Sequence, residues 1–487
     1  MINMEGNATE LFLHSQPMSS LSCTDKEKVP VESIKYQTLI SYVKNIFRLA
    51  IPNTIATSCW NLQFFIGYYF IGLLDDVKLI DGMSLGNTWN SIFGASLIYG
   101  FGTALSTFVS QYYGNKDYTK CGEVLNRAFM ILAVVLIPCI IMQCFATPIF
   151  LYSGINPEVA EHAGRVAIGL IPILILYIPI LLLEDFLIAQ QIAKPQMVFQ
   201  FINLLFYPLY CYFAVFILGW GMYGVVLARG ISYSAYIVML LIYMKYSQCC
   251  KDTIVAPSMN IFKGVKEYLS VALPSLVMNC LEWWGFEIMN IISARIGVAE
   301  MAANVIAFNY NGFIFMGTLG LGMASGALVG NSIGENNMFN AKMYIFLSVT
   351  LTTGISLFIG IILIIFRQFF TLVFTKDQEV MKIMKILMYL LVIEVIFDAN
   401  QGVLTRILIA MGKQKLASIA NLVGYYILMI PIGTIAAFVF GLGIYGIWIG
   451  LIFAGVGAVS GFLIIIYTVD WTQIRKEFLD KNPEGNN

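Results

Sequence analysis

The chain contains one short glycine-rich stretch twice. Residues 218–224 read LGWGMYG, and residues 440–446, which lie 222 positions further on, read FGLGIYG. Each copy stands between two long apolar segments, where glycines permit a tight turn between helices. A stretch that returns in the same context at so large a spacing indicates that the chain consists of two related halves.

Three further pairs of short stretches support the duplication, and the first of them has the same offset of 222 residues. The pairs are Ala50-Ile51-Pro52 with Ala272-Leu273-Pro274, Gly114-Asn115 with Gly334-Glu335, and Ile202-Asn203-Leu204 with Ala420-Asn421-Leu422.

The composition places both halves in a membrane. Of the 487 residues, 59% are apolar and only 11% are charged, and the mean hydropathy is +0.79. A soluble domain has about one quarter charged residues, so it could not have this composition. Twelve apolar segments are each long enough to cross ~30 Å of hydrocarbon as a helix. They are 46–73, 84–110, 124–150, 163–190, 197–218, 221–244, 268–294, 301–329, 342–366, 383–411, 416–439 and 444–468.

Each half contains six of these segments, an even number, so both halves keep the same orientation in the membrane. We therefore predict an all-α polytopic membrane protein with 12 transmembrane helices in two six-helix lobes, related by a parallel repeat about an axis along the membrane normal. This is the architecture of a secondary transporter. The expected regions are a tail at 1–44, a first lobe at 45–244, a linker at 245–267, a second lobe at 268–468 and a tail at 469–487.

Lysine and arginine residues predict the orientation. Twenty of them lie in the tails, in connecting loops or at segment ends on the side of the membrane that holds both termini. Seven lie on the opposite side, and Arg229 lies within a segment. Because basic residues are retained in the cytosol, both tails and the linker are expected there. The choice between the plasma membrane and a vacuolar or vesicular membrane stays open. The oligomeric state stays open too, since twelve helices can work as a monomer.

Several classes of function find no support in the sequence. Twenty-eight basic residues balance 28 acidic ones, so no positive field favours nucleic acid. Both glycine-rich stretches match the dinucleotide-binding pattern Gly-x-Gly-x-x-Gly, but they follow a membrane helix instead of a strand. The sequence contains no Walker A lysine motif, no Ser/His/Asp arrangement and no metal-ligand spacing. We therefore expect no enzyme activity, no metal and no cofactor.

Acids inside the apolar segments are the most informative residues. An ionised carboxylate at mid-membrane costs roughly 2.5–3.5 kcal/mol on insertion scales, so such residues mark function by default. Glu282 and Asp398 lie near the middle of their segments, and Glu394 lies four residues before Asp398 on the same helix face. Glu287 lies ~140° around the helix from Glu282, so the two cannot both face one cavity squarely.

A carboxyl group that is buried without a partner binds a proton near neutral pH, which is what proton coupling requires. The alternative for each acid is a structural hydrogen bond or an ion pair. A second set of acids, Glu184 and Asp185, lies closer to the cytosolic end of the segment 163–190. Arg229 reaches a similar depth in the segment 221–244, so we expect a structural or gating pair among these three residues.

Aromatic and amide side chains extend the candidate site. Aromatic faces together with carboxylates are what a cavity for lipophilic cations would use, and packing against lipid is the alternative. The candidate cavity residues beside the acids are Trp283, Trp284, Asn309, Tyr310 and Gln401.

Some of these residues lie in stretches that resemble the multidrug and toxic compound extrusion (MATE) family, and its eukaryotic branch in particular. LEWWGFE at 281–287 resembles the branch's helix 7 signature, and FDANQGVL at 397–404 resembles its helix 10 segment. VGNSIG at 329–334 and ALST at 104–107 resemble the family's stretches after helices 8 and 2. The similarity covers about residues 40–470.

The resemblance implies a V-shaped pair of lobes, as in the MOP superfamily, that alternates between inward- and outward-facing states. It also implies that Glu282, Glu287 and Asp398 carry the coupling. No carboxylate lies inside the first segment, where prokaryotic members often have an aspartate. The chain departs from the family pattern at two places. Glu184-Asp185 stands where a basic residue often follows the helix 4 turn, and Thr405-Arg406 stands where small residues are usual.

We therefore expect an efflux antiporter that exports small cationic or amphipathic drugs or metabolites in exchange for H⁺, with Na⁺ as the less favoured coupling ion. Two alternatives stay open. A flippase of the same superfamily would move a lipid-linked or amphiphilic substrate, but it should have a cationic cavity for phosphates, whereas acids dominate here. A non-transporting membrane receptor could also reuse such a bundle. The lipid bilayer is the remaining expected partner.

Overall fold

The computed structural model describes residues 39–74, 76–257 and 259–480. The chain divides into two units, Met1–Ser41 and Tyr42–Asn487. All the elements below belong to the second unit, apart from the first residues of α2. Every regular element in the described residues is a helix. The prediction of an all-α fold is therefore confirmed.

The first half consists of helices that continue one another or are joined by short turns. They are α2 (Leu39–Gly72), α3 (Val77–Asn90), η1 (Ser91–Ala95), α4 (Ser96–Gly102), α5 (Ala104–Gly114), α6 (Tyr118–Cys144), α7 (Ala146–Tyr152), α8 (Pro157–Gly169), α9 (Ile171–Ala189), α10 (Lys194–Tyr212), η2 (Phe213–Ile217) and α11 (Gly221–Tyr246). Two short helices, η3 (Gln248–Cys250) and η4 (Met259–Phe262), lie in the connection to the second half.

The second half has the same plan and ends in an additional short helix. Its elements are α12 (Val265–Ser293), α13 (Val298–Gly334), α14 (Met338–Ile365), α15 (Arg367–Phe374), α16 (Gln378–Ala410), α17 (Gln414–Asn421), η5 (Leu422–Met429), α18 (Ile430–Thr434), η6 (Ile435–Val439), α19 (Ile444–Thr468) and α20 (Trp471–Asp480).

Nine helices or continuous helical runs in the described ranges are long and apolar enough to cross a membrane. Three more helices, α2, α12 and α16, are 34, 29 and 33 residues long, but they contain more polar and charged side chains. Each of the twelve predicted segments lies on one helix or on consecutive helices, which is consistent with twelve crossings. The helix α2 begins at Leu39, before the expected tail boundary at residue 44.

Some predicted segments are not single straight helices. The segment 84–110 contains a π-helical turn and a break at Thr103. The segment 163–190 is divided at Leu170, and Pro172 stands in the first turn of the helix that follows. Proline has no N–H to donate to the preceding turn, so a new helix begins there. Hydropathy averaged over a whole segment does not reveal such local breaks.

The two halves repeat their local geometry as well as their sequence. The π-helical elements η2 and η6 are 222 residues apart. After them, Gly219 and Gly221 have φ angles of 69° and 52°, and Gly441 and Gly443 have 68° and 56°. Glycine is the residue that adopts this left-handed conformation without steric cost. The repeated Gly-x-Gly-x-x-Gly pattern is therefore a turn between two helices.

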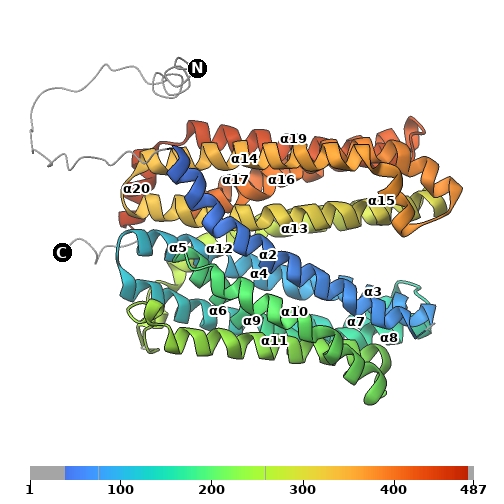
Figure 1. Cartoon of the computed structure of the whole chain (residues 1–487), viewed down its shortest axis with the longest axis horizontal. Coiled ribbons are helices and arrows are strands. Elements are labelled where there is room, and N and C mark those ends of the chain that lie inside the picture. Colours follow the sequence, from blue (N-terminus) through green and yellow to red (C-terminus); the bar gives the residue numbers. More distant parts are fainter. Residues whose placement is uncertain (1–38, 75, 258, 481–487) are drawn as a thin grey trace, which may run out of the picture. The chain divides into compact units, whose positions relative to one another are not determined.

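The first helix of each half packs against helices of both halves. The helix α12 packs against α4 of the first half and against α17 of the second. The helix α2 runs obliquely across the helices of both halves in Figure 1. Its Thr54 and Thr57 hydroxyls donate to carbonyl oxygens of α13 at 2.7 and 2.8 Å. These two helices therefore connect the halves.

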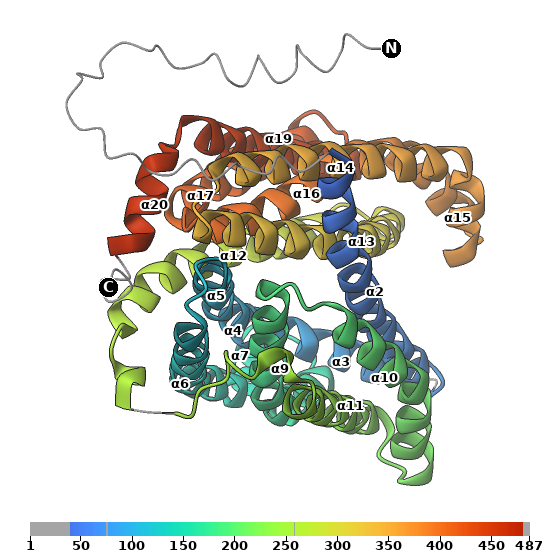
Figure 2. The same cartoon turned by 60° about the vertical axis from the view of Figure 1, so that its left-hand side comes forward.

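The halves also approach each other closely where α5 lies against the last turns of α13 and α16 (Figure 2). A Cβ atom added to Gly114 of α5 would lie 2.1 Å from the carbonyl oxygen of Asn331 in α13. The Thr107 hydroxyl of α5 donates to the carbonyl oxygen of Ile409 in α16 at 2.6 Å. We call this contact between α5 and the ends of α13 and α16 the packed end.

Trp448 is a buried anchor of the second half. Its ring is 0% exposed, and its Nε1 donates to Asn304 Oδ1 at 3.0 Å. Truncating a buried tryptophan to alanine costs about 3–5 kcal/mol, because it leaves a cavity. We expect Trp448→Ala to lower the melting temperature of the purified protein, whereas Trp220→Ala, at a ring that is 54% exposed, should leave it nearly unchanged. Equal melting temperatures for the two variants would contradict this.

Candidate functional site

Three acids of the second half form a buried cluster. Glu282 comes from α12, and Glu394 and Asp398 come from successive turns of α16. They are 6%, 3% and 5% exposed, respectively. Glu282 and Asp398 lie close enough for their charges to interact, and both also interact with the phenol of Tyr425. The structure therefore brings together two of the three predicted coupling acids and adds Glu394 to them.

Amide and hydroxyl groups hold this cluster. Gln401 Nε2 donates to Glu282 Oε2 at 2.8 Å, and Tyr425 donates its hydroxyl to Gln401 Oε1 at 3.0 Å. Asn311 Nδ2 donates to Glu394 Oε1 at 3.2 Å, while Glu394 Oε2 is buried and has no hydrogen-bond partner among the described residues. None of the ion pairs found in the described ranges includes these acids. Neutral hydrogen-bonding groups surround the carboxyl groups here.

Sequence reasoning missed two members of the cluster. Asn311 comes from α13, and Tyr425 comes from the π-helical element η5. Both are buried, at 5% and 2% exposed. Asn311 did carry a signal, because a buried amide within an apolar segment needs a hydrogen-bond partner. Tyr425 carried no such signal in a chain with 26 tyrosines.

Three other predicted residues contact different neighbours. Glu287 is half-buried and interacts with Asn290 of its own helix. The Tyr310 hydroxyl donates to the carbonyl oxygen of Phe370 at 2.8 Å, so it faces α15. Asn309 donates to a carbonyl oxygen of its own helix at 2.8 Å. Within the described part of the chain, no hydrogen bond or ion pair joins these three residues to the three acids.

The two adjacent tryptophans of α12 have different environments. The Trp283 ring stacks on Tyr99 of α4, with the ring centroids 5.3 Å apart and the planes at 24°. Trp284 is 37% exposed. Trp283 therefore lies where the two halves meet, directly beside Glu282 in the sequence.

The acids of the first half have partners of their own. Glu184 Oε1 accepts hydrogen bonds from the Tyr236 hydroxyl at 2.6 Å and from Trp60 Nε1 at 3.5 Å. Asp185 Oδ1 lies 3.6 Å from Arg406 Nη1 of α16, and both of these side chains are buried. The two neighbouring acids therefore face different surroundings.

Arg229 does not form the pair expected for it. Its Nη1 donates to Asn87 Oδ1 of α3 at 3.1 Å, and its guanidinium lies 5.7 Å from the ring centroid of Phe64 in α2. Asp185 instead faces the second half, where Arg406 is its partner. Membrane depth suggested Arg229, but the direction of each side chain around its helix decides the pairing.

The repeated helical halves and the buried carboxyl cluster define the class of this protein, which is an integral, multi-pass membrane transporter. The chain belongs to the MatE family, because the MatE family model matches it twice, at residues 52–213 and 274–435. The two matches are again 222 residues apart, in agreement with the predicted repeat.

Named relatives and solved structures agree with this family. Protein DETOXIFICATION 16 of Arabidopsis thaliana is 30% identical over 414 residues, which is 85% of either chain. Multidrug and toxin extrusion protein 1 of Xenopus tropicalis is 27% identical over 434 residues, which is 89% of this chain and 75% of that protein.

The crystal structure of the eukaryotic MATE transporter AtDTX14 matches with a TM-score of 0.86 at 26% identity, covering 91% of this chain and 99% of that one. An outward-facing MATE transporter of the MOP superfamily matches with a TM-score of 0.79 at 17% identity, covering 90% and 97% of the two chains, and supports the fold alone. The resemblance to the eukaryotic MATE transporters is thus confirmed.

Proposed function

We propose that the protein is a secondary active antiporter that exports organic cations, drugs or metabolites in exchange for protons. The observation that carries the proposal is the buried cluster of Glu282, Glu394 and Asp398, which has no basic partner among the described residues. The names of relatives, such as multidrug and toxin extrusion protein 1, support the substrate class.

The cluster suits an exchange of a proton for a cation. Burial and a neighbouring like charge both favour the protonated form of a carboxyl group. When deprotonated, the same group attracts a positively charged substrate, and a new proton removes that attraction. Because proton and cation compete for one set of carboxyl groups, inward movement of protons can drive outward movement of the cation.

Hydrogen bonds connect this chemistry to the helices. The bond between Gln401 and Glu282 joins α16 to α12, and the bond between Asn311 and Glu394 joins α13 to α16. An ionised carboxylate only accepts hydrogen bonds, whereas a protonated one also donates. Proton binding therefore changes which partners satisfy the acids, and so it changes the packing of three helices of the second half.

The proposed orientation places the packed end in the cytosol. The loops beside it contain Lys116 and Lys413, in keeping with the retention of basic residues on that side. The proposed lobes are residues 45–244 and 268–468, with cytosolic segments before, between and after them. Substrate would then enter from the cytosol when the packed end opens, and it would leave on the opposite side in the state described here.

Transport in proteoliposomes tests this proposal. The purified protein is reconstituted, and movement of a radiolabelled quaternary ammonium compound is followed under an imposed pH gradient and then under an imposed Na⁺ gradient. We expect the pH gradient alone to drive accumulation. Accumulation driven by Na⁺ alone would contradict proton coupling, and failure of both gradients with every cation tested would favour a flippase.

A further inference from the structure

A buried ion pair joins the two halves. Arg406 Nη1 of α16 lies 3.6 Å from Asp185 Oδ1 of α9, and the side chains are only 5% and 3% exposed. The pairs Lys78–Glu158, Arg165–Glu161 and Lys413–Glu477, by contrast, each join residues of the same half. Asp185 and Arg406 are also members of the two stretches, Glu184-Asp185 and Thr405-Arg406, at which the sequence departs from the family pattern.

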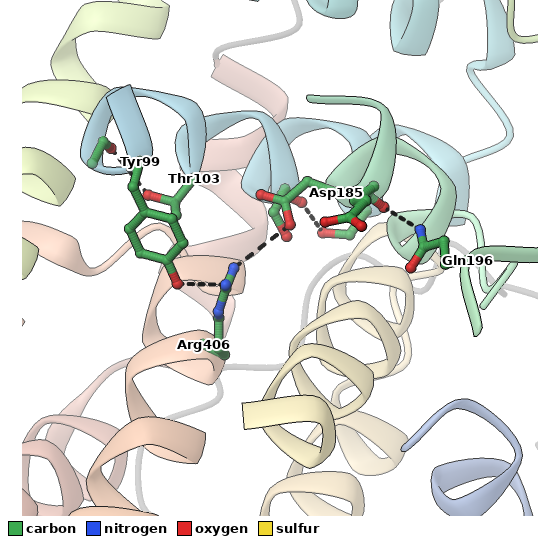
Figure 3. Close-up of polar contacts among 9 residues, drawn as sticks. Tyr99, Thr103, Asp185, Gln196 and Arg406 are labelled. Atoms are coloured by element: carbon green, nitrogen blue, oxygen red, sulfur yellow. Dashed lines mark hydrogen bonds and ion pairs between the residues drawn. The ribbon is translucent and has the colours of Figure 1, made fainter. Parts of the chain in front are cut away.

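Tyr99 of α4 is the third member of this arrangement (Figure 3). Arg406 Nη2 donates to the Tyr99 hydroxyl at 2.5 Å, and the guanidinium lies 5.3 Å from the centroid of the Tyr99 ring. Helices α4 and α9 of the first half thus both bind the Arg406 side chain of the second half. Aromatic faces and charge-assisted hydrogen bonds both strengthen the attachment of an arginine.

The arrangement lies between the packed end and the acid cluster. Arg406 is on the same helix as Gln401, which binds Glu282, and as Ile409, which contacts Thr107 at the packed end. Tyr99 stacks on Trp283, the residue that follows Glu282. Separating the halves at the packed end must therefore pull Arg406 away from Asp185 and Tyr99.

Burial makes the pair favour two states over any intermediate. While the halves are together, the two charges satisfy each other. If they separate fully, water hydrates both of them. A partial separation leaves each charge buried without a partner, which is unfavourable for both of them.

We propose that Asp185, Arg406 and Tyr99 form a latch that holds the packed end closed and opens once in each transport cycle. The proposal rests on the proposed function in one respect: the packed end opens because the transporter alternates between two states. Asp185 and Arg406 come from the two stretches at which the sequence departs from the family pattern. The gating contact is therefore made by residues in which this chain differs from that pattern.

Thiol labelling of a residue inside the packed end tests the latch. Ser110 of α5 is 0% exposed and faces Gly330 of α13, where an added Cβ would lie 2.0 Å from Ser110 Oγ. The variant Ser110→Cys in a cysteine-free background reports how often the packed end opens, through its rate of reaction with a maleimide in detergent.

Removing both charges together avoids a lone buried ion. We expect Asp185→Asn with Arg406→Gln to fold and to label about tenfold faster, because the variant loses the attraction between the two charges. A tenfold change is equivalent to about 1.4 kcal/mol. Tyr99→Phe keeps the ring and removes the hydroxyl, so its labelling rate should lie between that of Ser110→Cys alone and that of the double variant. A folded double variant that labels at the original rate, or more slowly, would overturn the latch.

A matched control removes an ion pair that does not join the halves. Glu477 of α20 accepts hydrogen bonds from Lys413 Nζ at 2.9 and 2.8 Å. Glu477→Gln should leave the labelling rate of Ser110→Cys unchanged, and an equal acceleration in this control would also overturn the latch. Labelling requires neither substrate nor gradient. A protein that labels as expected but transports no cation would contradict the proposed function and still support the latch.

Discussion

Replacing Asp398 with asparagine is expected to abolish proton-driven export while leaving the amount of folded protein unchanged. The amide has nearly the size and shape of the carboxyl group it replaces, so the packing of α16 stays intact. It can neither take up a proton near neutral pH nor attract a cation with a full charge. The measurement is accumulation of a labelled quaternary ammonium compound in proteoliposomes under a pH gradient.

Glu282→Gln should give the same loss, because Glu282 belongs to the same buried cluster. Glu379→Gln is the matched control, since Glu379 is exposed in the first turn of the helix that also carries Asp398. The control should transport normally. Normal proton-driven export by both Asp398→Asn and Glu282→Gln would refute the coupling site.

A methyl group at Gly114 is expected to prevent the packed end from closing. The added Cβ of Gly114→Ala would lie 2.1 Å from the carbonyl oxygen of Asn331, a distance that real Cβ atoms do not show. The obstacle is backbone of the other half, so it cannot rotate aside as a side chain would. We expect at least a tenfold loss of transport, the equivalent of about 1.4 kcal/mol, together with faster labelling of Ser110→Cys.

Gly354→Ala in α14 is the control for this substitution, because nothing lies within 4 Å of the added Cβ. Alanine favours a helix interior by up to ~1 kcal/mol over glycine, so this variant should be at least as stable as the original. Normal transport by Gly114→Ala would show that the packed end does not need to close as tightly as the structure has it.

The acids show how far the sequence leads. Glu282, Glu394 and Asp398 could be predicted one by one, because the cost of a charge in an apolar segment depends only on its local surroundings. Their grouping could not be derived in the same way. Residue spacing placed Glu287 ~140° around the helix from Glu282, and only the family resemblance gave it a coupling role; in the structure its contact is with Asn290 of its own helix.

The basic residues show the limit more clearly. Arg229 and Arg406 are both arginines within apolar segments, and depth alone suggested Arg229 as the partner of the first-half acids. In the structure Arg229 binds Asn87, and Arg406 of the other half pairs with Asp185. Which of two arginines reaches an acid depends on the rotation of each helix about its axis, and that rotation is set by packing against neighbours.

The sequence by itself determined that the chain crosses a membrane as helices, that it is a duplication with an offset of 222 residues, and that acids lie within its helices. These properties follow from hydrophobicity, from the need to satisfy backbone hydrogen bonds within lipid, and from repetition along the chain. Only the tertiary structure decided that Asn311 and Tyr425 complete the acid cluster and that Asp185 meets Arg406. Such contacts join residues far apart in the chain, and they depend on how whole helices pack against one another.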